Sequence, residues 1–320
     1  MNTRTWRHVA PVLVLAVLAA PRPARSQTAD ARTADPGILV SADWVAAHLS
    51  DPHVVVLHAD TRQQRFDEAH IPGARFLDMN GLMWEGDPPL GAQMRTPAAI
   101  DSTLEAVGVS DGQRIVLYAA NALMATRAWT TLDVMGLGDR ASVLDGGLEA
   151  WKEDGHAVSA AEGENGGPAS NGGNGVAKGS LTLHPRSGVV VDSDWILQHL
   201  DDSSVTILDA RAHDQYTGDE SSGGELHRGH IPGAYSLPWE DFVEGRTLPR
   251  MHSRADLAAL VRASGAADGS TVAVYCVTGM RASFDYFVSR LLGYDVKFYD
   301  GSWRDWGSKD LPTVKGPSRR

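Results

Sequence analysis

Four blocks of sequence occur twice in this chain, in the same order both times. Each keeps its character in both copies: a segment with Trp at its centre, the pentapeptide His-Ile-Pro-Gly-Ala, an apolar run ending in Tyr, and an Asp-Gly turn followed by Trp. Ordered repetition of this kind is an internal duplication, so we expect two copies of one domain. The matched blocks are 41–49 and 192–200, 70–74 and 230–234, 115–118 and 272–275, and 143–151 and 298–306.

Each copy alternates short apolar runs with helical segments, the pattern of an α/β domain whose mainly parallel sheet is flanked by helices. The first helical segment begins after Ser41 in one copy and after Asp192 in the other, and both are favoured N-cap residues. The stretch 163–180 is rich in Gly, Asn and Ser, as in a flexible linker. We predict a first domain at 37–160, a linker at 161–182 and a second domain at 183–312.

The first residues have the composition of an export signal. Arg4 and Arg7 give a basic start, 9–20 is an apolar run too short to span a bilayer, and 24–26 offers small residues for cleavage. We expect a signal peptide at 1–26 and an exported protein, periplasmic or secreted, that has no membrane contact after cleavage. An uncleaved membrane anchor is the alternative.

Cys276 is the only cysteine of the chain, so no intramolecular disulfide can form. It follows the apolar run 272–275 and precedes the helical segment 282–293, which places it in a strand-to-helix loop. Backbone N–H groups at a helix start bind anions and favour a thiolate. Arg281 adds a positive charge, and Gly279 lets the backbone bend. The loop therefore predicts a nucleophilic thiolate; a buried structural cysteine is the alternative.

The two copies differ at this position. Ala119 in the first copy matches Cys276 in the second, so we expect a non-catalytic first domain with a structural or substrate-gating role. The net charge of −11 argues against a nucleic-acid partner, and an anionic substrate would need local positive charge.

Taken together, these features resemble the rhodanese family, specifically the tandem-domain thiosulfate and 3-mercaptopyruvate sulfurtransferases. The resemblance rests on both His-Ile-Pro-Gly-Ala motifs, the Cys276 loop and the terminal motif 299–303, Tyr-Asp-Gly-Ser-Trp. It implies two tandem rhodanese-like domains with the active site between them. It also implies that Cys276 takes sulfane sulfur from a small anionic donor and passes the persulfide sulfur to a thiophilic acceptor, cyanide or a thiol. No metal or organic cofactor is required, and we expect a monomer.

The resemblance also assigns the residues that bind the donor. Arg211 occupies a position that commonly helps to bind the donor, with an ion pair to Asp209 or Asp214 as the alternative role. The histidines of the two repeated pentapeptides are a separate matter: for His70 and His230 we expect hydrogen bonds that maintain the fold, because both copies have such a histidine. The expected substrate-binding residues are Arg211, Val277, Thr278, Gly279, Met280 and Arg281. Arg281 could instead be structural, and Thr278 could cap the turn.

The donor remains open at this level. Val277 and Thr278 bring no charge, whereas Arg281 can hold a dianion, so we favour thiosulfate over 3-mercaptopyruvate. A persulfide carrier that serves a partner protein is a non-enzymatic alternative. A cysteine phosphatase is disfavoured because four residues, rather than five, separate Cys276 from Arg281. A thiol-disulfide oxidoreductase would need a second cysteine.

Overall fold

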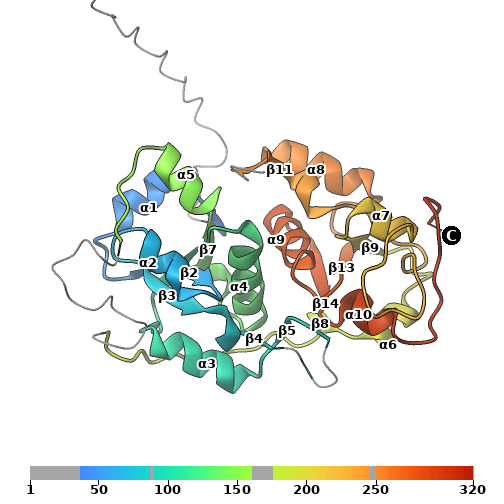
Figure 1. The fold of residues 1–320 in the computed structure, drawn as a ribbon, viewed down its shortest axis with the longest axis horizontal. Helices are drawn as coiled ribbons and strands as arrows, with labels where there is room; N and C mark the ends of the chain where they lie inside the picture. The colour runs from blue at the N-terminus through green and yellow to red at the C-terminus, as the bar shows by residue number, and fades with distance from the viewer. Residues whose placement is uncertain (1–36, 85, 87–89, 161–175, 246–249, 320) are drawn as a thin grey trace, which may run out of the picture.

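The structure, a computed structural model, consists of two α/β domains that lie side by side (Figure 1). The predicted signal peptide at 1–26 and most of the predicted linker at 161–182 fall outside the described residues. No helix in the described part combines the length and the apolar character that crossing a bilayer requires. The described residues are 37–84, 86, 90–160, 176–245 and 250–319.

The first domain has a five-stranded parallel sheet with the order β1-β7-β6-β2-β3. Its middle strands are buried on both faces, which suits their continuous apolar sequence. The strands are β1 (Leu39–Val40), β2 (Val54–Asp60), β3 (Arg75–Asp78), β6 (Arg114–Tyr118) and β7 (Ala141–Leu144), with an antiparallel hairpin of β4 (Met83–Trp84) and β5 (Gln93–Met94). The helices are α1 (Ala42–His48), α2 (Gln63–Glu68), α3 (Pro97–Ala106), α4 (Ala122–Val134) and α5 (Gly147–Glu153), with 3-10 turns η1 (Met79–Gly81) and η2 (Gly138–Arg140).

The second domain repeats this plan with the strand order β10-β9-β13-β14-β8, also all parallel. Its strands are β8 (Val190–Val191), β9 (Val205–Asp209), β10 (Tyr235–Ser236), β13 (Thr271–Tyr275) and β14 (Asp295–Tyr299), with a hairpin of β11 (Val243–Glu244) and β12 (Arg250–Met251). Its helices are α6 (Ser193–Gln198), α7 (His213–Thr217), α8 (Arg254–Ala263), α9 (Ala282–Leu292) and α10 (Ser302–Trp306), with the 3-10 turn η3 (Trp239–Phe242). The predicted duplicated α/β fold is thereby confirmed.

The predicted N-caps are present in both domains. Ser41 Oγ accepts a hydrogen bond from Trp44 N–H at 3.2 Å, and Asp192 Oδ1 accepts one from Trp195 N–H at 2.9 Å. Each cap satisfies a backbone donor that the helix itself leaves unpaired, and a Ser or Asp cap is typically worth about 1 kcal/mol. The repeated sequence thus starts the same helix at the same place in each domain.

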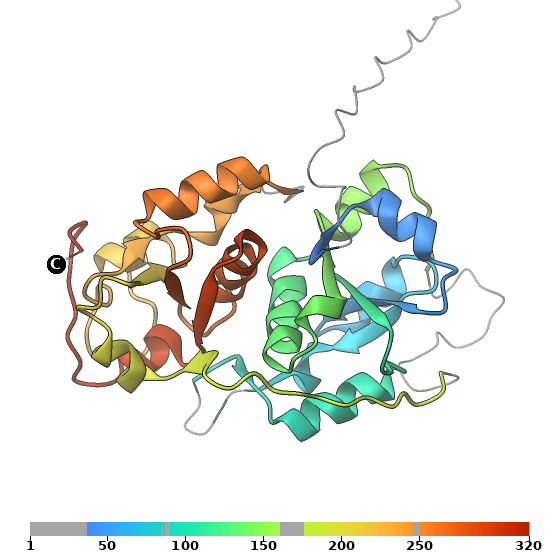
Figure 2. The same cartoon turned by 180° about the vertical axis from the view of Figure 1, so that it is seen from behind.

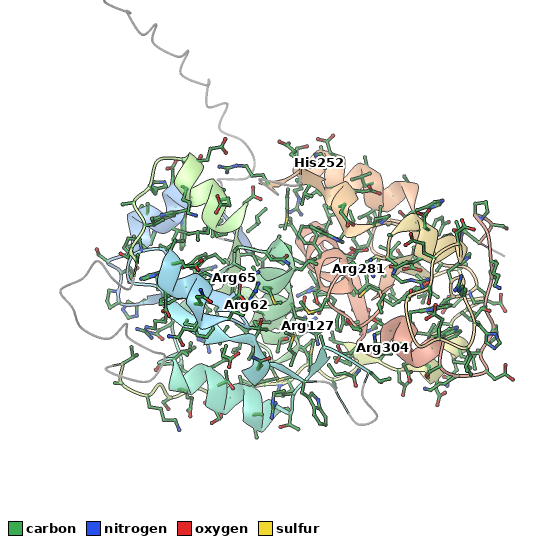
Figure 3. All side chains as sticks on the ribbon, viewed as in Figure 1. Arg62, Arg65, Arg127, His252, Arg281 and Arg304 are labelled. Atoms are coloured by element: carbon green, nitrogen blue, oxygen red, sulfur yellow. The ribbon has the colours of Figure 1, made fainter. Side chains whose placement is uncertain are left out.

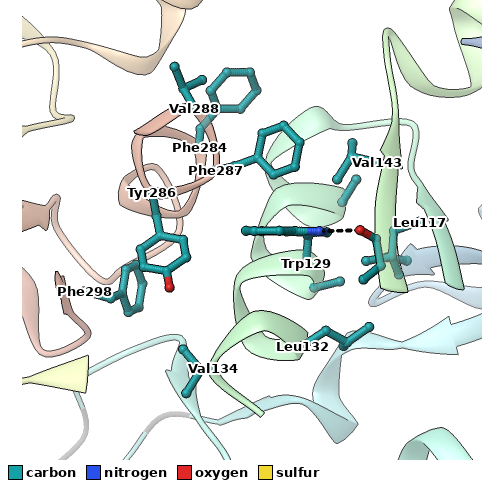
Figure 4. Close-up of a cluster of buried hydrophobic side chains, with 14 of the residues drawn as sticks. Leu117, Trp129, Leu132, Val134, Val143, Phe284, Tyr286, Phe287, Val288 and Phe298 are labelled. Carbon is teal, nitrogen blue, oxygen red and sulfur yellow. Dashed lines mark hydrogen bonds between the residues drawn. The ribbon is translucent and has the colours of Figure 1, made fainter. Parts of the chain in front are cut away.

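Helices α4 and α9 pack against each other where the domains meet (Figure 4). Trp129 of α4 meets Phe287 of α9 edge to face, with the ring centroids 4.9 Å apart. Trp129 also donates a hydrogen bond to the carbonyl of Ala141 at 2.9 Å. Tyr286 OH donates to Asp133 Oδ2 across the boundary at 2.6 Å. Because the buried core continues from one domain into the other, the two sheets are held in a fixed relation.

The hairpin of each domain, β4–β5 in the first and β11–β12 in the second, contacts the other domain. Met94 N–H of β5 donates to Asp300 Oδ2 at 2.8 Å, and Met251 N–H of β12 donates to Asp145 Oδ1 at 2.8 Å. Both acceptors are the aspartates of the repeated Asp-Gly turn, which follows β7 in one domain and β14 in the other. The exchange is reciprocal, and it brings chain from the first domain to the Cys276 loop.

The segment that joins the domains also packs on the first one. It runs along this domain before entering β8, as the yellow-green ribbon in Figure 2 shows. Gly179 N–H donates to the Glu105 carbonyl at 2.8 Å, and Arg186 N–H donates to the Val134 carbonyl at 2.7 Å. The chain therefore contacts the first domain on both sides of residue 183, where we predicted the second domain to begin.

Candidate active site

Cys276 directly follows β13, and α9 begins six residues later. The carboxyl ends of parallel strands are where α/β sheets place their ligand sites, so the cysteine lies where a reactive group is expected. Its side chain is buried. Gly279 has φ +87, which a residue with a side chain rarely adopts, and this conformation lets the loop turn into α9. The predicted strand, loop and helix are confirmed.

The backbone of this loop leaves its donors available. Cys276 O accepts a hydrogen bond from Trp303 N–H at 2.9 Å, and Val277 O accepts one from Arg304 N–H at 3.0 Å, so α10 holds these carbonyls. No hydrogen bond within the described residues uses the N–H groups of residues 277–281. Such a run of unpaired donors at a helix start binds anions and stabilises a thiolate or a persulfide anion.

Ser302 also holds the loop in place, and our sequence analysis did not single it out. Its Oγ accepts a hydrogen bond from Cys276 N–H at 3.2 Å and donates one to the Tyr299 carbonyl at 2.9 Å. It is the one non-glycine residue of the described chain with a positive φ, at 53°. Strained backbone of this kind clusters at functional sites. The first domain has Gly147 at the matching position, with φ 58.

Arg281 stands at the start of α9 and is half-buried. Its Nη2 donates to Gln215 Oε1 of α7 at 2.9 Å. Because the acceptor is a neutral amide, this hydrogen bond does not neutralise the positive charge of Arg281. Figure 3 places Arg281 on the second domain and Arg127 on the side of the first domain that faces it.

Arg127 is a second cation near the loop, contributed by the first domain and missed in the sequence. Its fully buried Nη2 pairs with Asp300 Oδ1 at 2.8 Å and donates to the Ala92 carbonyl. Its Nη1 and Nε have no partner among the described residues. A Cβ on Gly279 would lie 3.1 Å from Arg127 Nη1 and 3.0 Å from Asp300 Oδ1. The buried ion pair of Arg127 and Asp300 therefore packs against Gly279, and through Arg127 the first domain supports the Cys276 loop.

The first domain also reaches the outer side of the loop. A Cβ on Gly91 would lie 2.6 Å from Thr278 Cγ2, so only glycine permits this close approach. Thr278 therefore contacts the neighbouring domain, and its side-chain hydroxyl has no hydrogen bond to the turn among the described residues. Val277, Thr278 and Met280 are partly exposed along the loop, as substrate contact requires. Their binding roles stay predictions.

Arg211 is fully buried and ion-paired, which is the alternative that the sequence left open. It binds both carboxyl oxygens of Asp209, donates to the Gly229 carbonyl at 2.7 Å and lies over the ring of Trp303 at 4.3 Å. Burial alone would lower the pKa of Arg211, but Asp209 and Tyr275 raise it above its ordinary value. The structure thus places Arg211 beneath the site rather than at its surface, and its part in donor binding stays a prediction.

The paired histidines have the structural role that we expected. His70 Nδ1 bonds the Phe66 carbonyl at 2.8 Å, and His230 Nδ1 bonds the Tyr216 carbonyl at 2.9 Å. Each imidazole also stacks on the ring of the residue whose carbonyl it bonds. Burial lowers the pKa of His230, which favours its neutral form. Both histidines therefore maintain the fold.

The matching end of the first sheet has no room for a substrate. Its cavity, lined by Ala119, Thr126 and Asp145, has a volume of about 20 Å³, and Met251 and Phe284 of the second domain close it. A space of this size accommodates about one water molecule. No group of three or more potential metal ligands occurs in the described part of the chain.

Comparison with known proteins now identifies the fold. The family model for the rhodanese-like domain matches residues 41–154 and again 192–309. The chain belongs to the rhodanese family. The second matched range contains Cys276.

Three curated relatives align over most of their length. The sulfur carrier protein TtuD of Thermus thermophilus is 31% identical over 88% of this chain and 98% of its own. The 3-mercaptopyruvate sulfurtransferase of Escherichia coli K12 is 29% identical over 85% and 96%, and the thiosulfate sulfurtransferase of Pseudomonas aeruginosa is 29% identical over 85% and 94%. The chain is a rhodanese-family sulfurtransferase whose relatives differ in donor.

Two solved structures agree with this assignment. The Escherichia coli 3-mercaptopyruvate sulfurtransferase SseA superposes with a TM-score of 0.70 at 26% identity, covering 83% of this chain and 99% of that one. The anaerobic ergothioneine biosynthesis enzyme of Chlorobium limicola superposes with a TM-score of 0.74 at 23% identity, over 87% of this chain and 70% of that one. The second likeness concerns the fold alone.

Proposed function

We propose that this protein transfers the sulfane sulfur of thiosulfate, through a persulfide on Cys276, to a thiophilic acceptor. One observation supports this most strongly: Cys276 begins a loop whose successive N–H groups have no partner within the described chain, at the end of a buried parallel strand. Such a loop stabilises a thiolate before the transfer and a persulfide anion after it.

The proposed chemistry consists of two displacements. The Cys276 thiolate attacks the outer sulfur of thiosulfate; a new S–S bond forms, the old one breaks, and sulfite leaves with its electron pair. The acceptor, cyanide or a thiolate, then attacks the outer sulfur of the persulfide and regenerates the Cys276 thiolate. Arg281, which Gln215 holds by a hydrogen bond, supplies positive charge for the anionic donor.

3-Mercaptopyruvate is the second candidate donor. The side chains of Val277 and Thr278 bring no charge to the loop, so the loop itself sets no requirement for a dianion. The Escherichia coli relative is named for this substrate. A carrier role is the candidate from another class, because the Thermus relative is named as a sulfur carrier. We also propose that the protein is exported, on the sequence of residues 1–26 alone, and that it is a monomer.

The deciding experiment is steady-state thiocyanate formation from cyanide, with thiosulfate and 3-mercaptopyruvate compared as donors. We expect turnover with a higher kcat/KM for thiosulfate, and none for Cys276→Ser, which should unfold at the same denaturant concentration as the wild type. A higher kcat/KM for 3-mercaptopyruvate would reverse the donor assignment. A persulfide on Cys276 by mass spectrometry without multiple turnover would identify a carrier.

A further inference from the structure

The carbonyl group of Gly279 accepts two hydrogen bonds from one residue, Ser283. Ser283 N–H donates to it at 3.1 Å, the ordinary bond of a first helical turn, and Ser283 Oγ donates to it at 2.8 Å. Ser283 is fully buried, so its hydroxyl group is kept away from solvent. The hydroxyl therefore holds the orientation of a peptide group that belongs to the Cys276 loop.

This peptide group joins Gly279 to Met280. A peptide unit is planar and trans, so its N–H points opposite to its carbonyl group. Because the Gly279 carbonyl points into the first turn of α9, the N–H of Met280 points out of the helix start. It has no hydrogen-bond partner among the described residues, and Met280 is only partly buried. The hydroxyl of Ser283 thus sets the direction of a free donor.

The neighbouring peptide groups of the loop are held by backbone donors alone. Cys276 O and Val277 O accept from the N–H groups of Trp303 and Arg304, which directs the N–H groups of Val277 and Thr278 away from α10. Among the carbonyl groups of residues 276–279, the one that accepts from a side chain within the described chain is that of Gly279. It is therefore the one that a single substitution can release.

Helix α4 of the first domain contacts both partners of this hydrogen bond. Thr130 Oγ1 is buried and donates to the Ser283 carbonyl at 3.2 Å. Arg127 lies three residues earlier, on the same side of α4, and its Nη1 would lie 3.1 Å from a Cβ on Gly279. The first domain therefore fixes the position of Ser283 as well as that of the peptide group it holds.

A purely structural role is the ordinary reason for such a bond, because helical hydroxyl groups often donate to the carbonyl four residues earlier. Thr126 matches Ser283 in the first domain, and its Oγ1 lies 3.1 Å from the Ala122 carbonyl and 3.3 Å from that of Leu123. The bond itself is thus common to both domains. What the two domains do with the donor behind it is different.

The first domain satisfies the donor that matches Met280 N–H. Leu123 is the matching residue, and its N–H donates to Asn121 Oδ1 at 3.0 Å. Thr278 takes the place of Asn121 in the second domain, and no side chain of the described residues accepts from Met280 N–H there. The domain with the cysteine therefore keeps free a donor that the other domain caps.

We propose that Ser283 is a positioning residue that directs the N–H of Met280 at the anion held in the Cys276 loop. This rests on the proposed function, in which that anion is first the thiosulfate donor and then the persulfide anion. Ser283 acts through the Gly279–Met280 peptide group and contacts neither the donor nor the sulfur.

Kinetics of single substitutions provide the first test. Ser283→Ala removes the hydroxyl but keeps the backbone bond to Gly279, so the KM for thiosulfate should rise by about two- to tenfold with a smaller change in kcat. Ser283→Thr restores a hydroxyl, as Thr126 does in the first domain, and should keep the wild-type KM. Ser289→Ala and Thr126→Val are the controls: Ser289 Oγ is buried without a partner on α9, and Thr126 is at the end without a cysteine.

Binding without sulfur transfer provides the second test. In Cys276→Ser, which has no thiol, thiosulfate should shift the Met280 amide resonance in heteronuclear NMR spectra. In the double variant Cys276→Ser, Ser283→Ala this shift should become smaller, and the Kd for thiosulfate should rise by about the same factor as the KM. A merely structural role of Ser283 would leave the Met280 response and the Kd unchanged.

The possible results separate this inference from the proposed function. A wild-type KM in Ser283→Ala, an equal rise in Ser289→Ala, or a Met280 resonance that does not respond to thiosulfate overturns the role of Ser283. If Ser283→Ala does not fold, the Met280 resonance of Cys276→Ser still decides. Thiosulfate binding that weakens without the Ser283 hydroxyl, in a protein that forms no thiocyanate, would support this inference and reject the proposed function.

Discussion

Ser302 accounts for how the backbone of Cys276 is held. Ser302 has a positive φ, a conformation that favours glycine, and the matching residue of the first domain is Gly147. A serine at this position is strained, but its Oγ supplies the acceptor for Cys276 N–H that glycine lacks. The strain thus accompanies a hydrogen bond to the one residue on which the proposed chemistry depends.

This difference predicts that two small substitutions at Ser302 share a loss of activity but differ in stability. Ser302→Gly relieves the strain but removes the hydrogen bond, so we expect nearly unchanged stability and a fall in kcat/KM of about tenfold, the equivalent of about 1.4 kcal/mol. Ser302→Ala removes the bond and keeps the strain, so it should also be less stable by about 1 kcal/mol. Urea unfolding and thiocyanate kinetics on both variants check this. Equal activity of Ser302→Gly and wild type would remove Ser302 from the site.

Arg211 and Asp285 show where residue-level prediction from the sequence stops. The sequence identified Arg211 as a cation near the site, but only the folded sheet end shows that Asp209 engages it on both oxygens. Asp285 stands between apolar residues near a helix start, where an acid is ordinarily a favourable charged group. In the structure its side chain is fully buried, and neither carboxyl oxygen has a hydrogen-bond partner among the described residues. This depends on how α9 packs, which residue spacing does not encode.

The elements themselves were largely predictable. Apolar runs, N-cap residues and the repeated blocks gave β13, the Cys276 loop and α9 at close to their observed limits. The hairpins β4–β5 and β11–β12 were not predicted, because strands of two residues leave almost no periodic signal. The β4–β5 hairpin reaches the Cys276 loop, so the sequence located the candidate nucleophile but not all of its surroundings.

Contact between α7 and α9 predicts a role for Gln215. A neutral amide holds Arg281 by a single hydrogen bond and leaves its charge available to a donor. Gln215→Glu would place a carboxylate there instead and neutralise that charge. We expect the KM for thiosulfate to rise about fivefold with a smaller change in kcat, since partly exposed charge pairs of this kind are worth about 1 kcal/mol.

Steady-state kinetics with both donors check this prediction. 3-Mercaptopyruvate has one negative charge fewer than thiosulfate, so its KM should rise less. Gln215→Met is the control, because it removes the hydrogen bond without adding charge. An equal KM for thiosulfate in Gln215→Glu and Gln215→Met would mean that Arg281 does not bind the donor through its charge.

At the scale of the whole molecule, the duplication makes the two domains exchange equivalent contacts. Each hairpin reaches the Asp-Gly turn of the other domain, but only one of the two sheet ends has a cysteine. The other end is filled by Met251 and Phe284. The packing is symmetric although the two sheet ends are not: the first domain has no cysteine, yet it contacts and supports the loop of Cys276 in the second.

Arg127 tests whether that support matters for catalysis. Arg127→Met should break the buried pair with Asp300, leave that carboxylate short of a partner and destabilise the protein by about 3–5 kcal/mol. Because Arg127 lies directly behind Gly279, we also expect kcat/KM to fall by tenfold or more, by the equivalence of about 1.4 kcal/mol with a factor of ten.

The reciprocal hairpin supplies the matched control. Arg250 pairs with Asp154 of the first domain at 2.9 Å, but this pair is partly exposed and lies at the end of the sheet that has no cysteine. Arg250→Met should cost about 1 kcal/mol or less and leave kcat/KM nearly unchanged. If Arg127→Met lost stability but kept full kcat/KM under conditions where it is folded, the first domain would hold the second without shaping its chemistry. A selective loss of kcat/KM in Arg127→Met alone would show that the cysteine loop depends on a charge from the domain that has no cysteine.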